Sequence, residues 1–308
     1  MLALGVDTSN YATSLAVVDT TKREVVCSLK EFLPVKEGEL GLRQNDAIFH
    51  HTIAIPALFK EVESNLPLHG VNCVAASNRP RPVEGSYMPC FLAGVSAAAA
   101  FAAGRGLTLH TTSHQQGHLA AALFGAGLPN TETFLFFHVS GGTTELLLVK
   151  GYEIVGKLGG STDLHAGQAV DRLGVRLGLP FPAGEALSLL AASCTEEVAP
   201  KISVKGIDCS FSGLENKCEQ LLQQGHSAAY VAKYCLVAVA DTVAAMALEA
   251  RRQHPGVPVL LAGGVMASDV VRPRLAARLG KVHFAPPQLS ADNAVGVALV
   301  GAKEESHG

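Results

Sequence analysis

The sequence predicts a mixed α/β fold built from two similar subdomains. Two segments, residues 2–18 and 134–149, share one pattern: an apolar run, a short turn of small polar residues, and a second apolar run. This pattern is typical of a β-hairpin. Each hairpin opens a stretch in which helical and strand patterns alternate, which favours a sheet covered by helices. We therefore expect a duplicated domain with subdomains at residues 1–125 and 126–308, and leave open that the last helix returns to the N-terminal half.

In the first subdomain, helical and strand patterns follow the hairpin. Residues 50–62 carry apolar residues at helical spacing, and the apolar run at residues 71–76 predicts a short strand. Residues 91–103 are apolar and rich in alanine, but this stretch is too short to span a bilayer, so it predicts a buried helix. The chain also enters a strand pattern at once, without the basic segment of an export signal. We therefore expect a cytoplasmic protein with no membrane partner.

In the second subdomain, the amphipathic pattern of residues 162–178 predicts a helix that ends at a glycine. Asp171 in this helix either belongs to a solvated charged face or bonds a ribose hydroxyl. Residues 230–252 predict a long alanine-rich helix, and the apolar run at residues 257–262 predicts a buried strand that leads into two glycines. A further helix should follow, with its N-cap at residue 268 or 269.

Composition limits the class of protein. Of the 308 residues, 48% are hydrophobic and 17% are charged, which excludes a disordered chain, a coiled coil and a collagen-like repeat. The net charge of −3 lacks the basic excess of a freestanding nucleic-acid binder, so any RNA contact should be local or shared with a partner protein. The seven cysteines lie singly, which argues against a disulfide framework or a zinc ribbon and is consistent with a reduced cytosol.

Three turns rich in glycine or hydroxyl residues are candidates for binding a nucleotide. In such turns backbone N–H groups can point at one anion, and glycine lets a ribose approach the backbone closely. Any one turn alone is more often a simple connection, and a histidine inside an apolar run is more often a core residue. Together, the three are similar to the plan of the actin-like ATPase (ASKHA) architecture, in which two subdomains enclose a cleft. The candidate residues are Thr8, Ser9 and Asn10 in the first turn, His138, Val139, Ser140, Gly141 and Gly142 around the second, and Gly263 and Gly264 in the third.

His114 and His118 form a candidate metal pair. Residues four apart lie on one face of a helix, so both imidazoles can reach one ion. Two histidines are too few for a tight site, and Asp292, at the start of the last predicted helix, is the best candidate for an oxygen ligand. The alternative is that the two histidines cap a helix or face solvent. The glutamate of an H-E-x-x-H protease is missing, because residues 115 and 116 are glutamines.

The order of these motifs resembles that of the TsaD family, once called O-sialoglycoprotein endopeptidase, whose members transfer a threonylcarbamoyl group to tRNA. The resemblance covers nearly the whole chain and includes several ordered motifs. They are Val139-Ser140-Gly141-Gly142, the pair His114 and His118, Asp292-Asn293, residues 163–171, Pro182-Ala183-Gly184, residues 210–214, and residues 262–265.

The resemblance implies an acyltransferase whose ligand is ATP or threonylcarbamoyl-adenylate. In the family, the amino group of a tRNA adenosine beside the anticodon attacks the carbonyl of the adenylate. One divalent metal, iron or zinc, would be held by His114, His118 and Asp292 and would stabilise developing charge. Asp171, Gly184 and the glycines of the third turn would hold the adenosine part. The implied partners are tRNA and subunits similar to TsaB and TsaE.

The sequence departs from the family's motifs close to the reacting groups. Two acidic positions of the family's first turn, E-T-S-C-D-E-T, are Tyr11 and Ala12 here, and the histidine of S-G-G-H-T-Q is Thr143. The family's G-P-G loop is replaced by residues 78–86, and an asparagine near the third turn is Ser268, which we keep among the nucleotide-binding candidates. These changes leave open a paralogue that binds ATP and scaffolds a tRNA-modification complex, or one that transfers another carbamoyl-type group. A small-molecule kinase would not need the metal pair, and a peptidase would need a nucleophile–base pair that the sequence does not offer.

Overall fold

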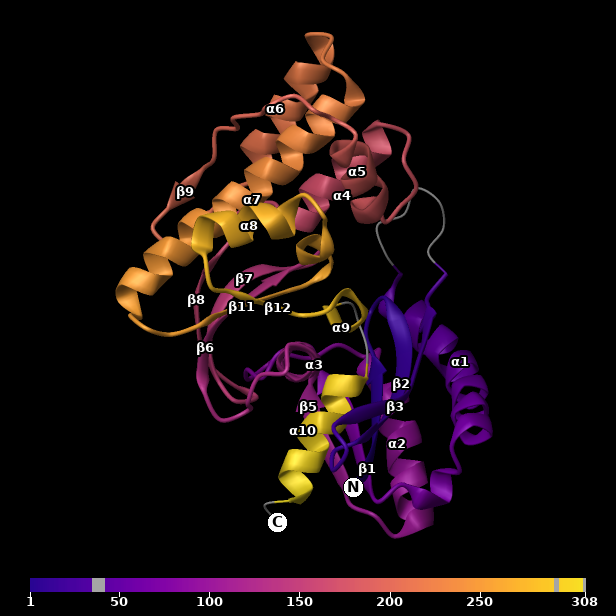
Figure 1. The fold of residues 1–308 in the computed structure, drawn as a ribbon. Coiled ribbons are helices and arrows are strands. Elements are labelled where there is room, and N and C mark those ends of the chain that lie inside the picture. Colours follow the sequence, from indigo (N-terminus) through magenta and orange to yellow (C-terminus); the bar gives the residue numbers. More distant parts are fainter. Residues whose placement is uncertain (35–41, 291–293, 307–308) are drawn as a thin grey trace. The chain divides into compact units, whose positions relative to one another are not determined.

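A computed structural model describes residues 1–34, 42–290 and 294–306 of the chain (Figure 1). The chain divides into two compact units, and each is described by itself. Unit 1 comprises Met1–Asn130 and Ala291–Gly308, and unit 2 comprises Thr131–Ser290. The last helix therefore belongs to the same unit as the N-terminal segment.

Unit 1 contains a five-stranded mixed sheet. Its elements are β1 (Leu2–Thr8), β2 (Ala12–Asp19), β3 (Glu24–Phe32), α1 (Gln44–Asn65), the short 3₁₀ helix η1 (Leu68–Gly70), β4 (Cys73–Arg79), α2 (Phe91–Arg105), β5 (Leu109–Ser113), α3 (His114–Gly125) and α10 (Val295–Glu305). The strand order is β3-β2-β1-β4-β5. The first three strands pair antiparallel, whereas β4 and β5 continue parallel to β1. In Figure 1, α1 and α2 lie on one side of this sheet and α10 on the other.

Unit 2 contains a second five-stranded mixed sheet. Its elements are β6 (Thr133–Val139), β7 (Thr144–Lys150), β8 (Glu153–Gly160), α4 (Ala166–Arg176), α5 (Gly184–Ala192), β9 (Val204–Lys205), β10 (Asp208–Cys209), α6 (Ser212–Gln223), α7 (Ala228–Gln253), β11 (Val259–Ala262), η2 (Gly264–Ala267), α8 (Val271–Leu279), β12 (His283–Phe284) and α9 (Pro287–Ser290). The strand order is β12-β11-β6-β7-β8, with β9 and β10 paired separately. The first three sheet strands in the chain pair antiparallel, and β11 and β12 run parallel to β6.

The two sheets have the same topology. In each, an antiparallel three-stranded meander is extended by two strands that run parallel to its first strand. The first strand of each hairpin, β1 or β6, takes the central position. This confirms the predicted duplication of an α/β unit.

Side chains of β1 alternate between the two faces of its sheet. Leu4 lies in one core with Leu58 of α1 and Ala98 of α2. Gly5 faces the opposite side, where a Cβ atom would lie 2.2 Å from the carbonyl oxygen of Ala294. Only glycine leaves room for this approach, so the start of α10 lies directly on the sheet.

The stretch at residues 91–103 does form a helix, but α2 is not buried as expected. Gly94, Ala98 and Ala102 face the core, whereas Leu92 on the other face is 49% exposed. Alanine is apolar but small, so an alanine-rich sequence does not distinguish a buried helix from a half-exposed one.

The helix predicted from residue 162 begins at Ala166. Asp163 does not enter the helix because its carboxylate accepts hydrogen bonds from the N–H groups of Phe211 and Ser212, at 2.9 and 3.2 Å. His165 becomes the N-cap, and the side chain of Gln168 bonds back to the His165 N–H at 3.0 Å. Because of this long-range contact, the helix begins four residues later than the local pattern predicts.

The central helix of unit 2 is α7. By length and composition it could cross a membrane, but 83% of its most apolar window is buried inside the structure. A helix in the core of a globular domain can be as apolar as a membrane-spanning helix. Its buried face packs with Leu135 and Phe137 of β6 in the main core of the unit.

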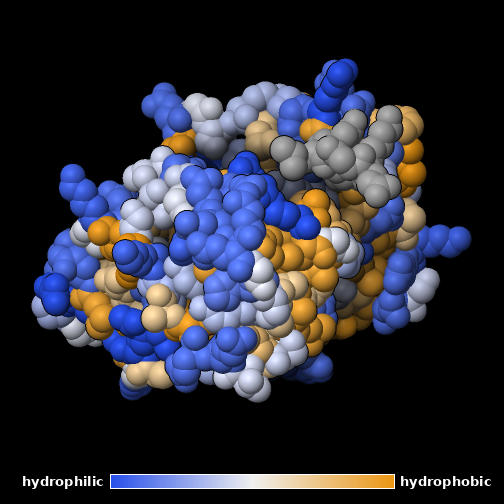
Figure 2. Space-filling model, turned by 90° about the horizontal axis from the view of Figure 1, so that it is seen from above, coloured by the Kyte–Doolittle hydropathy of each residue, from blue (hydrophilic) through white to orange (hydrophobic). Residues whose placement is uncertain are grey.

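The surface mixes polarities, and Figure 2 shows hydrophilic and hydrophobic residues side by side on the face that it views. Scattered exposed hydrophobic residues are normal in globular proteins. Phe49 and Ile53 instead form a pair of neighbouring exposed side chains, because they lie one turn apart on α1 and are 62% and 58% exposed.

Candidate functional site

Three parallel strands of unit 1 bring polar side chains together where the strands end. Asp7 lies near the end of β1, Ser77 lies in β4, and β5 leads directly into His114. Ser77 donates a short hydrogen bond to the Asp7 carboxylate, and the His114 Nδ1 atom lies 3.0 Å from each of its oxygens. Because an ionised carboxylate only accepts hydrogen bonds, Nδ1 of His114 carries the proton. The fully buried Asp7 thus fixes the orientation of the His114 ring.

His114 and His118 lie on one face of α3, as the spacing predicted. Their Nε2 atoms are 3.0 Å apart, and their rings meet edge to face. The helix start is fixed by Ser113, whose hydroxyl accepts from the N–H of Gln116, while the Gln116 side chain accepts from the N–H of Ser113. The two imidazoles therefore converge from a well-anchored first turn.

The geometry of this pair fits a divalent metal. Two nitrogen ligands of one tetrahedral zinc ion lie roughly 3.3 Å apart when each Zn–N bond is about 2.0–2.1 Å. With its Nδ1 proton held by Asp7, His114 presents the lone pair of Nε2, which is the usual arrangement of a metal-bound histidine. Asp292, the expected third ligand, lies outside the described residues.

Asp7 was not among the predicted site residues. A usable signal existed, because carboxyl ends of neighbouring parallel strands meet at one edge of a sheet. Asp7 ends one such strand, and the His114–His118 pair follows another. Without the strand order, however, the sequence could not show that β1 and β5 run in the same direction.

The first candidate turn, Thr8 to Asn10, is held by hydrogen bonds within unit 1. Thr8 Oγ1 accepts from an N–H of α2 at 3.2 Å, and Ser9 Oγ accepts from the two N–H groups that follow the turn, both at 3.3 Å. Asn10 Oδ1 accepts from the Gln44 side chain at 2.7 Å. These side chains thus have structural partners, and their role toward a phosphate stays a prediction.

His51 of α1 contacts the same turn through its buried side chain, and the sequence did not predict this role. Its Nε2 atom lies 2.9 Å from the carbonyl oxygen of Ser9, and its Nδ1 atom lies 2.7 Å from the hydroxyl of Thr13. Since a carbonyl only accepts, Nε2 carries the proton and Nδ1 accepts from Thr13. Burial is the main reason that the pKa of His51 lies below its ordinary value, so the ring is neutral at pH 7.

In unit 2 the second and third candidate turns come into contact. Gly263 has φ = +103°, and a Cβ atom there would lie 2.2 Å from the carbonyl oxygen of Val139. Gly141 lies in the turn between β6 and β7, where an added Cβ would be 3.6 Å from Oδ2 of Asp171. The segment from Val139 to Gly142 therefore lies beside both Asp171 and Gly263. A common binding site would require this arrangement.

One hydrogen bond joins Asp171 to Ala183, the residue before Gly184. Oδ1 of Asp171 accepts from the N–H of Ala183 at 2.8 Å, and Gly184 follows as the first residue of α5. Burial raises the pKa of Asp171, and the bond from Ala183 opposes that shift. Among the residues that the structure describes, a Cβ at Gly184 would meet no atom within 4 Å.

The remaining candidates of unit 2 occupy less distinctive positions. The Ser268 hydroxyl lies 2.8 Å from that of Ser188 and accepts from the N–H of Val270, so it ties the start of α8 to α5. His138 is buried in β6, where its Cα partner in β7 is Glu145. Gly264 is the first residue of η2, and a Cβ added there would contact none of the described residues within 4 Å.

The departures from the family's motifs lie at both turns. Tyr11 is 49% exposed beside the first turn, whereas Ala12 is fully buried as the first residue of β2. Thr143 closes the second turn, where its carbonyl accepts from the N–H of Ser140 at 2.8 Å. The glutamine that ends the family's S-G-G-H-T-Q motif is the buried Glu145 here, and its carboxylate lies 3.4 Å from the Lys157 ammonium group.

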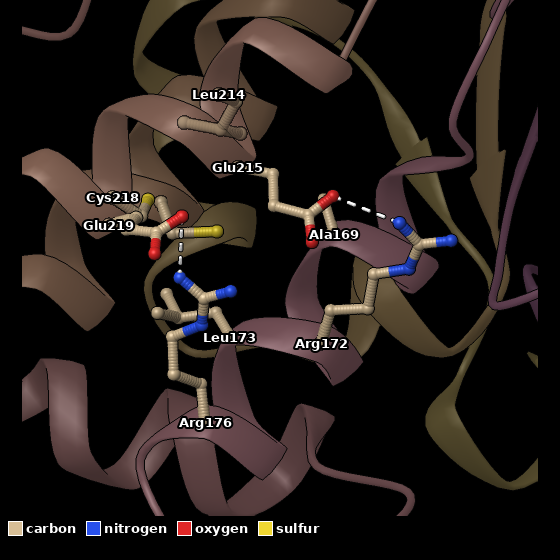
Figure 3. A pocket seen from close by; sticks show the side chains of 9 residues that line it. Ala169, Arg172, Leu173, Arg176, Leu214, Glu215, Cys218 and Glu219 are labelled. Atoms are coloured by element: carbon tan, nitrogen blue, oxygen red, sulfur yellow. Dashed lines mark hydrogen bonds and ion pairs between the residues drawn. The ribbon is translucent and has the colours of Figure 1, made fainter.

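A small pocket between α4 and α6 lies apart from these turns (Figure 3). Arg172 and Arg176 point into it, but each is paired with a glutamate of α6, Glu215 at 3.0 Å and Glu219 at 2.8 Å. Paired guanidinium groups are poor anion sites because a ligand would have to displace the carboxylates. These ion pairs also explain the charged face that the sequence shows on this helix.

Comparison with known proteins gives a consistent result over the whole sequence. The model of the TsaD family, described as tRNA N6-adenosine threonylcarbamoyltransferase, matches residues 36–299. A relative with that same name from Thermus thermophilus is 31% identical over 313 residues, an alignment that covers 100% of this chain and 94% of the relative.

Solved structures share the fold at much lower sequence identity. An activator of 2-hydroxyisocaproyl-CoA dehydratase from Clostridium difficile, with bound ADPNP, superposes with a TM-score of 0.60 at 15% identity, covering 100% of this chain and 96% of that one. A ROK family glucokinase from Streptomyces griseus superposes with a TM-score of 0.55 at 15% identity, covering 98% of this chain and 100% of that one. The architecture is that of the actin-like ATPases, as the turns predicted.

Proposed function

The chain belongs to the TsaD family of tRNA N6-adenosine threonylcarbamoyltransferases, and on this basis we propose that it transfers a threonylcarbamoyl group from threonylcarbamoyl-adenylate to a tRNA adenosine beside the anticodon. The adenosine N6 attacks the carbamoyl carbonyl carbon and forms the new C–N bond. The bond from that carbon to the phosphate oxygen breaks, AMP leaves with its electron pair, and N6 loses a proton. The observation that carries the proposal is the convergence of His114 and His118, whose Nε2 atoms are 3.0 Å apart.

We propose that His114, His118 and Asp292 hold one divalent metal, iron or zinc. When bound, such an ion acts as a Lewis acid toward an oxygen that gains negative charge. Asp7 keeps the proton on Nδ1 of His114, which leaves Nε2 as the ligand atom. The choice of Asp292 is supported by Ala294, two residues later in the sequence, whose carbonyl packs onto Gly5 in the same strand as Asp7.

The adenosine part of the ligand is proposed to bind in unit 2. The glycines at 141, 142, 263 and 264 would offer backbone N–H groups, and the lack of neighbouring described atoms at Gly184 and Gly264 would allow a close approach. Ser140 would contribute its hydroxyl, because its own N–H is bound to the Thr143 carbonyl. Oδ1 of Asp171 is used by Ala183, and Oδ2 faces Gly141, so this second oxygen is positioned to accept from a ribose hydroxyl. His138, Val139 and Ser268 would then support the site from β6 and from the start of α8.

We propose that tRNA binding depends on partner subunits similar to TsaB and TsaE in the cytoplasm. A net charge of −3 gives the isolated chain little general attraction to phosphates. The exposed Phe49 and Ile53 on α1, together with Leu92 on α2, offer an apolar surface for a protein partner.

The test is a reconstituted transfer assay. The purified chain is mixed with threonylcarbamoyl-adenylate and unmodified tRNA, with and without the partner subunits, and nucleosides are analysed by mass spectrometry. We expect threonylcarbamoyladenosine with the wild type and with the control variant His69→Ala, which removes an exposed histidine of unit 1. The variant His118→Ala should lose both the product and its share of bound metal. Absence of product from the wild type with every partner combination would contradict the proposal.

A second candidate function is favoured by one observation. Ala12 stands where the family's motif carries an acid, and it is fully buried in β2, where its methyl group supplies no charge. A nucleotide-binding subunit that scaffolds a tRNA-modification complex is consistent with this loss. It would bind ATP and its partners in the same assay but give no product.

A further inference from the structure

Unit 1 contains a second cluster of metal-ligating side chains. The sulfur of Cys73, a ring nitrogen of His110 and a carboxylate oxygen of Glu305 all lie within 4.8 Å of one another. His110 and Glu305 already touch, with Nε2 and Oε2 2.5 Å apart. The proposed reaction uses none of these three residues.

Three regular elements fix the positions of the cluster. Ala75 of β4 is paired with His110 of β5, and Cys73 lies two residues before Ala75, so all three side chains point to one face of the sheet. On that face Gly301 of α10 packs so closely that a Cβ atom would lie 2.4 Å from the Ala75 Cβ and 3.6 Å from the His110 Cβ. Glu305 lies four residues after Gly301, on the same side of the helix. The backbone therefore aims all three ligand atoms at one point.

The set of donor atoms selects the metal. Thiolate, imidazole and carboxylate together suit Zn²⁺, whereas Mg²⁺ and Ca²⁺ prefer oxygen ligands alone. In a tetrahedral site the ligand atoms lie roughly 3.3–3.8 Å apart, so the Glu305 carboxylate has to move about 1 Å away from His110. It is free to do so, because it belongs to the last residue of α10 and is 37% exposed. Three protein ligands leave the fourth position to water.

We propose that Cys73, His110 and Glu305 bind one Zn²⁺ ion that ties the end of α10 to the beginning of β4 and β5. This site is distinct from the His114–His118 pair, which lies at the other end of β5, roughly 13 Å along the strand at about 3.3 Å per residue. Burial raises the pKa of Cys73 to about 12, so the thiol is protonated without metal. Binding then exchanges the thiol proton for the ion and releases that proton to solvent. The proposal involves unit 1 alone and does not depend on the transfer reaction.

Cobalt distinguishes the two metal sites by spectroscopy. Co²⁺ replaces Zn²⁺ in such sites, and a thiolate ligand gives a sulfur-to-cobalt charge-transfer band in the near ultraviolet that nitrogen and oxygen ligands do not give. In the full chain, stripped with a chelator and titrated with Co²⁺, we expect this band to appear and to reach its full intensity once both metal sites are filled, at no more than two equivalents. It should persist in His118→Ala, which removes a ligand of the other site, and in Cys27→Ser, which removes a half-buried cysteine of the same unit.

Variants of the cluster should behave differently. Cys73→Ser should abolish the band, and Glu305→Gln, a change at an exposed side chain that leaves the core intact, should weaken cobalt binding about tenfold or more. Zn²⁺ should raise the midpoint of thermal unfolding of His118→Ala, and it should raise that of the double variant His118→Ala/Cys73→Ser much less. Absence of the band in the wild type, or a band that survives Cys73→Ser, would overturn the proposal and leave a plain His110–Glu305 ion pair beside a core thiol.

Discussion

The first turn of unit 1 and the equivalent turn of unit 2 connect the same two strands of the same topology, yet they are stabilised differently. Around Thr8 to Asn10 the turn is held by side chains, including Ser9, Gln44 and the buried His51. In unit 2, Val139 to Gly142 present mainly backbone, and Gly263 approaches them without a side chain. The duplicated hairpin is supported by a network of side chains in one unit, and in the other its backbone packs closely against Gly167 and Gly263.

Under the proposed function, this difference would give one topology two kinds of chemistry. A side-chain network orients fixed ligand atoms such as Nε2 of His114, because each ring or carboxylate has two or more partners. Glycine turns instead leave N–H groups and space for a ligand to fill. We therefore expect unit 1 to be sensitive to the loss of single hydrogen bonds, and unit 2 to be sensitive to the addition of single carbon atoms.

The largest effect is expected from Gly263→Ala. The new methyl group would lie 2.2 Å from the Val139 carbonyl oxygen, at a φ of +103° that alanine rarely adopts. Relieving the overlap requires moving β6 or η2, which should lower the free energy of unfolding by about 4 kcal/mol. The neighbouring Gly264→Ala is the matched control, because its methyl group would meet no atom of the described part of the chain within 4 Å. Equal denaturation midpoints for the two variants would refute the close approach.

A smaller effect, about 2–3 kcal/mol, is expected from His51→Ala. The change leaves the Ser9 carbonyl and the Thr13 hydroxyl without their buried partner, and it opens a cavity beneath the first turn. Urea denaturation measures the loss. His50→Ala, one residue away and outside this network, should cost much less, and a similar cost for both would show that the turn does not depend on His51.

Asp7→Asn tests the orientation of the metal pair without removing a ligand. The substitution keeps the size of the side chain but weakens its hold on the Nδ1 proton of His114, so zinc affinity should fall about 10- to 100-fold. The measurement belongs in the Cys73→Ser background, where the second cluster cannot contribute. Asp46→Asn, on the exposed side of α1, is the control and should leave the affinity unchanged.

The smallest effect is a pH dependence. Burial lowers the pKa of His51 in the folded state, while Asp7 acts in the opposite direction and His50 in the same direction. Below about pH 6.5 the unfolded chain therefore binds a proton that the folded chain does not, and the free energy of unfolding falls, by at most about 1.4 kcal/mol per pH unit. The loss continues until the pH drops below the folded pKa. His51→Gln removes this contribution, so an unchanged slope between pH 6.5 and 5.5 would count against a neutral buried ring.

Much of the fold was predictable because it rests on local patterns. Apolar runs around small turns indicated both hairpins, and helical spacing indicated α1 and α7. The His114–His118 pair was predictable for the same reason, since four residues make one turn of a helix. The start of α4 was not, because Asp163 bonds to residues almost fifty positions later.

The parts of the site that sequence reasoning missed depend on strand order and burial. Asp7, Ser77 and His114 meet only because β1, β4 and β5 run parallel in that order. His51 resembles any helical histidine until the first turn is placed above it. Cys73, His110 and Glu305 come from three elements spread over more than 230 residues, so no spacing rule connects them.

The place of α10 has a consequence for synthesis of the protein. Gly296 lies so close to Gly117 that a Cβ atom would be 1.7 Å from its carbonyl oxygen, and Gly5 meets the same helix from the sheet. The ribosome adds this helix only after all of unit 2 has been made, so the earlier-made strands of unit 1 wait with one face uncovered while unit 2, continuous in the chain, can fold completely. We therefore expect unit 1 to complete its fold last, and its uncovered sheet to be accessible to chaperones until α10 has been made.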